Sequence, residues 1–228
     1  MFFNCNKLEE ISFIDCYFAN TLITNMKGIF QNCESLTSLN LATFYTPKVI
    51  IMWNMFKNCK NLTSLNVANF NTSNVIDMES MFEGCEKIIC LDLSDFETSN
   101  VQYMNKMFKN CYALKDLNFK KIKATSVGTM HQMFYNCKSL TSLNLFSLTE
   151  NGQTIAEMFD GTSPDFKFCV EENEKIPSIY EMLLHKENTT RDCSEDCYGQ
   201  GHKRVNISEK KLCCRNVSYN GSCYEKCP

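Results

Sequence analysis

The sequence predicts an α/β repeat solenoid, a right-handed coil of strand-turn-helix units with a parallel sheet on one face. The first observation behind this prediction is a five-residue phrase, Met-Phe-x-Asn-Cys with small variations, whose copies begin at residues 1, 29, 55, 81, 107 and 133. After the first copy the spacing is a constant 26 residues. The second observation is that each unit combines two apolar periods, one of two residues and one of three to four. Such self-similarity indicates stacked units that bury their apolar faces against one another.

The period of two predicts one short strand in each unit. In a central copy Leu65 and Val67 alternate with polar residues, as expected for a half-buried strand. Ile11 and Phe13 take these positions in the first copy, and we expect Phe168 to lie in the last strand, with Val170. The pairs between them are Leu39 and Leu41, Leu91 and Leu93, Leu117 and Phe119, and Leu143 and Leu145. Seven strands are therefore expected.

The period of three to four predicts a helix after each strand. One face of such a helix carries Val75, Met78, Phe82 and Cys85. Residues 72–74, Thr-Ser-Asn, precede this series, and their side-chain oxygens are suited to cap the helix start.

Three regions follow from the pattern. Residues 1–172 form the solenoid, with about six units, and Met1 aligns with the repeat methionine, so we expect the chain to start inside a unit. In residues 173–190 we expect a capping helix and linker, because Pro177 precedes the apolar Ile179 and Met182 at helical spacing. Residues 191–228 form a cysteine-rich tail with too few aliphatic residues for a core.

The fifteen cysteines separate into groups by position. One group occupies the last position of the repeated phrase and is called the buried thiol ladder: Cys5, Cys33, Cys59, Cys85, Cys111 and Cys137. We expect these residues to act as small, inert hydrophobes. Disulfides between neighbouring units are the alternative, because stacked strands lie within disulfide reach, although parallel Cβ directions disfavour them. Cys90 replaces a serine of the strand and is expected to be a free thiol.

The tail has a different cysteine chemistry. In an oxidising compartment, three disulfides are expected among Cys193, Cys197, Cys213, Cys214, Cys223 and Cys227. A zinc site that includes His202 is the alternative, but the spacings miss the usual paired knuckles. N-glycosylation sequons interleave with these cysteines and favour an extracellular location; the candidate acceptors are Asn61, Asn71, Asn188, Asn206, Asn216 and Asn220.

Outward residues of the predicted strands are the candidates for ligand binding. The candidates are Asn66, Asp92, Asp116, Asn118, Lys120, Asn144 and Phe146. Phe146 is an exposed-aromatic candidate for anchoring a protein partner. The competing explanation for the asparagines is structural, because stacked amides can bond to one another along a solenoid.

The repeat resembles a known family. The elements Leu-x-x-Leu-x-Leu, Phe-x-Thr-x-x-Val and Met-Phe-x-Asn-Cys, over roughly residues 1–171, are similar to BspA-like (DUF285-type) leucine-rich repeats of bacterial and protist surface proteins. The resemblance implies a leucine-rich-repeat solenoid and a secreted or surface-attached adhesion protein, which contacts host matrix or other cells through protein or glycan ligands.

Composition and motifs narrow the possible functions. The net charge of −3 gives no reason to expect nucleic acid, and no stretch has the roughly 20 apolar residues that span a membrane. We expect no enzyme activity and no cofactor, because the three histidines lie outside any catalytic spacing. Two alternatives to surface recognition stay open: an intracellular leucine-rich-repeat scaffold, and a structural solenoid with a zinc-binding tail.

Overall fold

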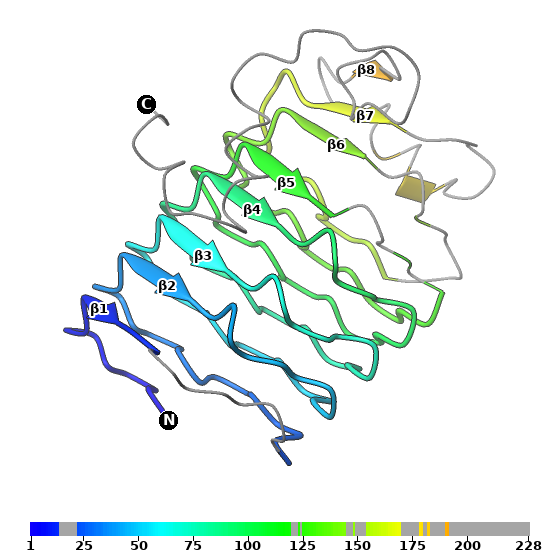
Figure 1. Cartoon of the computed structure of the whole chain (residues 1–228). Helices are drawn as coiled ribbons and strands as arrows, with labels where there is room; N and C mark the ends of the chain where they lie inside the picture. The colour runs from blue at the N-terminus through cyan, green and yellow to red at the C-terminus, as the bar shows by residue number, and fades with distance from the viewer. Residues whose placement is uncertain are drawn as a thin grey trace, which may run out of the picture.

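The computed structural model describes residues 1–13, 22–119, 123, 125–144, 148, 154–169, 178–179, 182 and 190–191. In this part the chain winds as a stack of similar coils, and one strand of each coil lies on a common face (Figure 1). The strands are β1 (Glu10–Ile11), β2 (Ser38–Asn40), β3 (Ser64–Asn66), β4 (Cys90–Asp92), β5 (Asp116–Asn118), β6 (Ser142–Asn144), β7 (Lys167–Cys169) and β8 (Thr190–Arg191).

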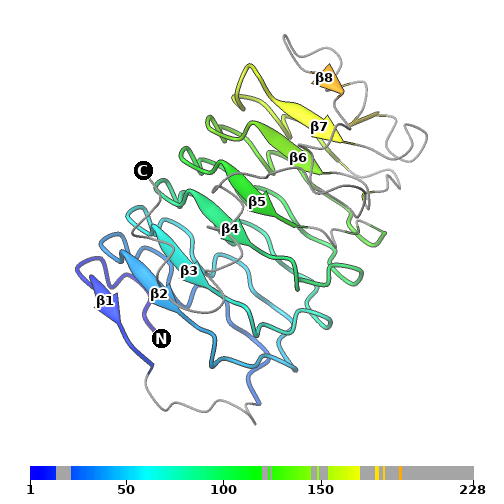
Figure 2. The ribbon, with the colours of Figure 1, turned by 45° about the horizontal axis from the view of Figure 1, so that its top comes forward.

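The strands are parallel and keep the register of the sequence repeat. Leu39 pairs with Leu65, Leu91 with Leu117, and Leu143 with Phe168. The hydrogen-bonded groups are β1-β2-β3, β4-β5 and β6-β7-β8, so the ladder is interrupted twice although the strands follow one another across the face (Figure 2). The seven predicted strands are confirmed, with the parallel sheet on one face. The additional strand β8, which pairs with β7, was not predicted.

The predicted repeat helices are wrong. After each of the strands β1 to β6 the described residues form a series of overlapping β-turns, without any α-helix. In one coil the N–H groups of Met55, Lys57 and Cys59 donate to the carbonyl groups three residues earlier. Turns in series bring residues three to four apart to the same side, so the apolar spacing alone does not distinguish them from a helix. We call this side of the coil, residues 25–33 and their equivalents in later coils, the turn face.

Hydrogen bonds between coils hold the turn face together. The N–H groups of Met52, Asn54, Phe56 and Asn58 donate to the carbonyl oxygens of Asp77, Glu79, Met81 and Glu83, at N···O distances of 2.9, 3.0, 2.9 and 2.7 Å. The same four bonds recur from Met26, Met78, Met104 and Met130 onward. Alternate N–H groups thus point along the stack, whereas in an α-helix they would point along their own segment.

Left-handed residues make this sideways direction possible. Two residues of each turn-face segment have positive φ, such as Asn54 at 57° and Asn58 at 59°. The second position is occupied in every coil by asparagine or glycine, the residues that adopt this conformation at least cost: Asn4, Asn32, Asn58, Gly84, Asn110, Asn136 and Gly161. The asparagine of the repeated phrase is therefore required by backbone geometry.

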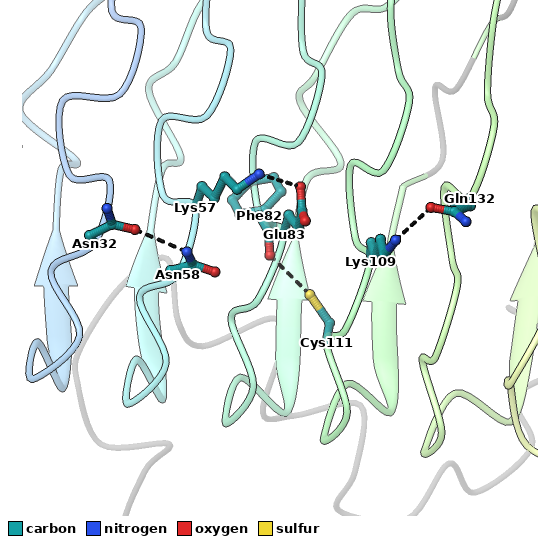
Figure 3. A network of polar contacts seen from close by, with 8 residues as sticks. All are labelled: Asn32, Lys57, Asn58, Phe82, Glu83, Lys109, Cys111 and Gln132. Atoms are coloured by element: carbon teal, nitrogen blue, oxygen red, sulfur yellow. Dashed lines mark hydrogen bonds and ion pairs between the residues drawn. The ribbon is translucent and has the colours of Figure 1, made fainter.

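The amides at this position also bond from coil to coil. Asn58 Nδ2 donates to Asn32 Oδ1 at 3.0 Å (Figure 3), and Asn136 Nδ2 donates to Asn110 Oδ1 at 3.0 Å. Gly84 interrupts the series, and a Cβ there would lie 2.5 Å from Asn58 Oδ1. At this position each coil therefore has either an asparagine amide or a glycine that leaves room for the amide of the preceding coil.

The core lies between the strand face and the turn face. Its centre is a stack of parallel phenylalanine rings from the repeated phrase, with centroids 5.3 to 5.7 Å apart from Phe2 through Phe30, Phe56, Phe82, Phe108 and Phe134. Phe159 continues the stack in the last described coil. The inward strand leucines and the turn-face methionines surround the rings and are almost fully buried. These rings are among the largest side chains that each coil buries, so their burial contributes strongly to stability.

A buried threonine joins the coils at one corner. Thr72 Oγ1 donates to the carbonyl of Glu97 at 3.0 Å and accepts from the N–H of the same residue at 2.8 Å. Thr46 and Thr98 make the equivalent pairs with the coils that follow them. The threonine was predicted to cap a helix; instead its hydroxyl satisfies one donor and one acceptor that the corner would otherwise bury unpaired.

Only a few residues after the last coil are described. Ser178, Ile179 and Met182, in the segment where a capping helix is predicted, are helical, and Ile179 is fully buried against the core. Apart from Thr190 of β8, the rest of the predicted capping segment lies outside the described residues, as do Val170 and residues 192–228.

Substitution of Asn110 tests the left-handed position. Asn110→Ala and Asn110→Gly both remove the amide contact with Asn136. Only the alanine variant is also destabilised by the positive φ of 61° at this position. The alanine variant should be less stable than the glycine variant by about 1 kcal/mol in urea unfolding. Gly128→Ala is the matched control, because its Cβ would meet only Gln102 O at 3.8 Å, and it should not destabilise. An alanine variant at least as stable as the glycine variant would contradict this assignment.

Candidate binding surface on the strand face

Two columns of outward side chains make up the strand face. The first column is Ser38, Ser64, Cys90, Asp116 and Ser142, and the second is Asn40, Asn66, Asp92 and Asn118. Leucines between the columns point into the core. Paired strands hold each column in register, and the described outward side chains of β2 to β5 are half-buried or exposed.

Side chains of the second column mostly bond to their own coil. The Oδ1 atoms of Asn40, Asn66 and Asp92 accept the N–H of the residue two positions later, at 3.0, 3.1 and 3.0 Å. This local bond turns the chain away from the sheet at the strand end. One contact between coils is present among the described residues, from Asn118 Nδ2 to Asp92 Oδ1 at 2.8 Å. The expected continuous amide ladder on this face is therefore wrong, because the nearer backbone N–H takes the oxygen.

The sheet opens between β3 and β4. The N–H of Leu41 donates to Asn66 O at 2.8 Å, and that of Leu93 donates to Asn118 O at 2.8 Å. The corresponding N–H, that of Val67, has no hydrogen bond to β4 among the described residues. A cavity of about 110 Å³ lies at this opening, lined by residues 65–68 and 92–96.

A second hollow continues the first along the loops after β3 and β4. It has a volume of about 280 Å³ and is lined by Tyr45, residues 68–72, Asp95 and Glu97. Ala68 and Asp95 line both hollows, and together we call them the Asp95 groove. Three carboxylates, those of Asp92, Asp95 and Glu97, lie in its walls, and its described lining contains no lysine, arginine or histidine.

Several polar side chains of the turn face, in contrast, pair with one another, although Asn54 Oδ1 is buried there without a partner. Lys57 Nζ lies 2.8 Å from Glu83 Oε2, and Lys109 Nζ lies 2.6 Å from Gln132 Oε1 (Figure 3). Lys27 Nζ stands 3.9 Å from the centre of the Trp53 ring. On the strand face the hydroxyls of Ser38 and Ser64 have no such partner among the described residues.

The structure places the thiol ladder inside the core. The thiols of Cys59, Cys85, Cys111 and Cys137 are buried, and each Sγ donates to the carbonyl oxygen of the phrase phenylalanine in the preceding coil, at 3.1 to 3.2 Å. Cys33 makes the same bond to Phe2 O at 3.1 Å, and Cys5 is half-buried. All of these are free cysteines, so the alternative of disulfides between coils is wrong.

Burial determines the protonation of these thiols. Loss of hydration raises the pKa of Cys85 to about 12 and, with a smaller effect of Cys5, that of Cys33 to about 11. It also raises the pKa of Cys59 and Cys111 well above the usual value. A protonated thiol without solvent access is a poor nucleophile and a poor metal ligand. The ladder therefore serves packing and hydrogen bonding.

The remaining predicted site residues divide into described and undescribed ones. Asp116 lies beside Cys90, whose free Sγ is 3.6 Å from Asp116 Oδ2. The side chain of Asn144 is not described, and Lys120 and Phe146 lie outside the described residues. The groove was hard to predict, because Asp95, Glu97 and Tyr45 belong to loops. The available signal was acidic residues, such as Asp92, in a column occupied elsewhere by neutral ones.

Two predicted glycosylation acceptors are described. Asn61 Nδ2 donates to Glu34 O at 2.8 Å, and Asn71 Oδ1 accepts the N–H and hydroxyl of Ser73 at 3.0 and 2.7 Å. Both side chains are thus engaged within the fold. The acceptors Asn188, Asn206, Asn216 and Asn220, the six tail cysteines and His202 lie outside the described residues.

The described residues contain no group of three or more histidine, cysteine or acidic side chains arranged to hold a metal. Within the same part of the chain, every helical segment is too short or too polar to cross a bilayer.

Fold and surface define a leucine-rich-repeat solenoid whose second face is built from turns. The family model described as "Mycoplasma protein of unknown function, DUF285" matches residues 24–148. This is more than half of the 228 residues, and the chain belongs to that family, as its BspA-like repeat motifs indicate.

One solved structure similar to this chain is a leucine-rich repeat protein from Eubacterium ventriosum ATCC 27560. It has 20% sequence identity and a TM-score of 0.36, and the match covers 57% of this chain and 31% of that one. The chain thus spans about a third of its length. No curated protein matches the chain.

Alkaline pH tests the buried thiols. Above pH 9 the unfolded chain loses thiol protons that folded Cys85, with a pKa of about 12, retains. The unfolded state then binds fewer protons, so the free energy of unfolding falls as pH rises, by about 1.4 kcal/mol at pH 10 for one such thiol. The free energy of unfolding in urea should therefore fall less between pH 7 and pH 10 in Cys85→Ala than in the unsubstituted protein, by about 1.4 kcal/mol.

The control is Leu114→Ala, which empties an equally buried position without removing an ionisable group. It should lower stability by a similar amount at both pH values. An unchanged pH dependence in Cys85→Ala would mean that this thiol ionises equally in the folded and unfolded chains.

Proposed function

We propose that this chain is a non-catalytic recognition module, exposed at the cell surface or outside the cell, that binds a protein or glycan partner through the strand face. The observation that carries the proposal is the difference between the two faces. Several long turn-face side chains pair within the protein, as Lys57 does with Glu83 and Lys109 with Gln132. On the strand face, Ser38, Ser64 and the Nδ2 groups of Asn40 and Asn66 have no partner among the described residues. Unpaired polar groups in register are suited to hydrogen bonds with a ligand.

The stacked architecture supports this role. Each coil fixes its neighbours, so the outward residues of successive strands form a preorganised surface that loses little conformational entropy on binding. The open ladder between β3 and β4 adds a concave feature to this surface. Adhesion and a surface location are also what the family resemblance implies.

Matched serine substitutions test the proposal. The purified full chain is screened for binding to a panel of extracellular-matrix proteins and to a glycan array. Ser64→Arg places a bulky charge in the centre of the strand face and should weaken binding to the ligand found by about tenfold, the effect of losing one central contact. Ser126→Arg makes the same change at an exposed position outside both columns and should have no effect.

Circular dichroism of both variants controls for folding. Equal loss in the two variants, or no ligand among the panel and the array, would contradict strand-face recognition.

A further inference from the structure

We infer that two copies of this chain associate about a two-fold axis, through an apolar patch at the start of the turn face. The patch consists of Ile50, Ile51, Trp53, Ile76 and Tyr103, and we call it the isoleucine patch. The inference goes beyond the proposed function, because the patch adjoins the turn face and the proposed ligand binds the strand face.

The isoleucine patch arises because one coil carries apolar residues at three outward positions. In the coil that follows β2 these positions hold Ile50, Ile51 and Trp53. The equivalent residues of other coils are mostly polar: Thr24, Asn25 and Lys27; Ile76, Asp77 and Glu79; Gln102, Tyr103 and Asn105; and Gly128, Thr129 and His131. The repeat itself therefore does not require apolar side chains here.

The apolar side chains of the patch are accessible and lie next to one another. Ile50 is 39% exposed and Tyr103 is 45% exposed, while Ile51, Trp53 and Ile76 are half-buried. Ile76 N–H donates to Ile50 O at 2.9 Å, and Tyr103 N–H donates to Ile76 O at 3.3 Å, so these residues are neighbours across successive coils. Apolar side chains gathered on one surface favour an interface with another protein.

Opposite charges flank the patch along the stack. Gly28 N–H donates to Trp53 O at 2.9 Å and Asn54 N–H donates to Glu79 O at 3.0 Å, so Lys27, Trp53 and Glu79 occupy equivalent positions of three successive coils. Lys27 Nζ stands 3.9 Å from the centre of the Trp53 ring. The order along this line is therefore a cation, an aromatic ring and a carboxylate.

The Glu79 carboxylate is available to a partner. It has no hydrogen bond or ion pair among the described residues. The neighbouring Asp77 carboxyl differs, because its Oδ1 accepts the Glu79 N–H at 2.9 Å. Burial raises the pKa of Asp77, and the charge of Lys27 partly opposes that rise. Glu79 is thus the carboxylate beside the patch that is suited to an ion pair with another molecule.

The line of charges identifies the partner as a second copy. In a two-fold interface the same patch of each copy meets the other. An axis through Trp53, perpendicular to the surface, places the two Trp53 rings together and Lys27 of each copy opposite Glu79 of the other. This arrangement has an aromatic and aliphatic centre with a charged rim, which is the usual anatomy of an interface. The patch is small, so the dimer should be weak and its population should depend on concentration.

Sedimentation velocity of the full chain tests the inference, at concentrations from about 5 to about 500 μM, which bracket the affinity expected of a small interface. The chain should shift from monomer to dimer within this range. Lys27→Glu and Glu79→Lys each place like charges opposite one another twice, and each should weaken dimerisation about tenfold. An equimolar mixture of these two variants pairs opposite charges at both places and should associate as well as the unsubstituted protein.

Two controls separate this contact from general effects of charge. Lys87→Glu reverses a charge at an exposed position outside the patch, and Ser64→Arg changes the strand face; both should leave dimerisation unchanged. A monomer at every concentration would contradict the inference and leave the patch to a different partner. Failure of the mixture to associate, or equal weakening by Lys87→Glu, would exclude the two-fold arrangement. Neither result would bear on ligand binding by the strand face, which Ser64→Arg tests.

Discussion

Hydrogen bonds between the turn faces of successive coils are the constraint on which the rest of this structure depends. In the central coils four alternate N–H groups donate to the next coil, and the second and fourth of these donor residues are left-handed. At roughly 1 kcal/mol net for each bond, this ladder contributes about as much per coil as burial of one or two large side chains. It also fixes the spacing at which the phenylalanine rings stack and the thiols meet the preceding carbonyls. The repeated phrase is thus a structural unit in which every residue has a physical role.

The strand face obtains its regularity from the same ladder. Because the turn face sets the translation from coil to coil, the outward residues of the strands fall into columns without needing to bond to one another. This arrangement also tolerates the opening between β3 and β4, since the coils on either side stay joined at the turn face and at the buried threonine corner. A groove can therefore form on one face without loss of the stack.

Sequence reasoning succeeded where a signal was local and strictly periodic. The strands, their inward leucines and the inward position of the repeat cysteines all follow from alternation at a constant spacing. It failed on the second face, where Val75, Met78, Phe82 and Cys85 fit a helix and a series of turns equally well. The decisive signal was the column that contains Asn58, Gly84 and Asn110, because only asparagine and glycine share an inexpensive left-handed conformation. The groove was not predicted, because it arises from the interruption of the sheet between β3 and β4 and from loop residues such as Tyr45 and Glu97, although Asn66 and Asp92 of the second column also line it.

Through-hydrogen-bond NMR couplings on the turn face test the central claim most directly. If the coils are joined as described, the amide nitrogen of Phe56 couples to the carbonyl carbon of Met81, and that of Asn58 to the carbonyl carbon of Glu83. A repeat built on helices would instead couple each nitrogen to the carbonyl four residues earlier in its own segment, as from Phe56 to Met52. Observation of the second pattern would contradict the account.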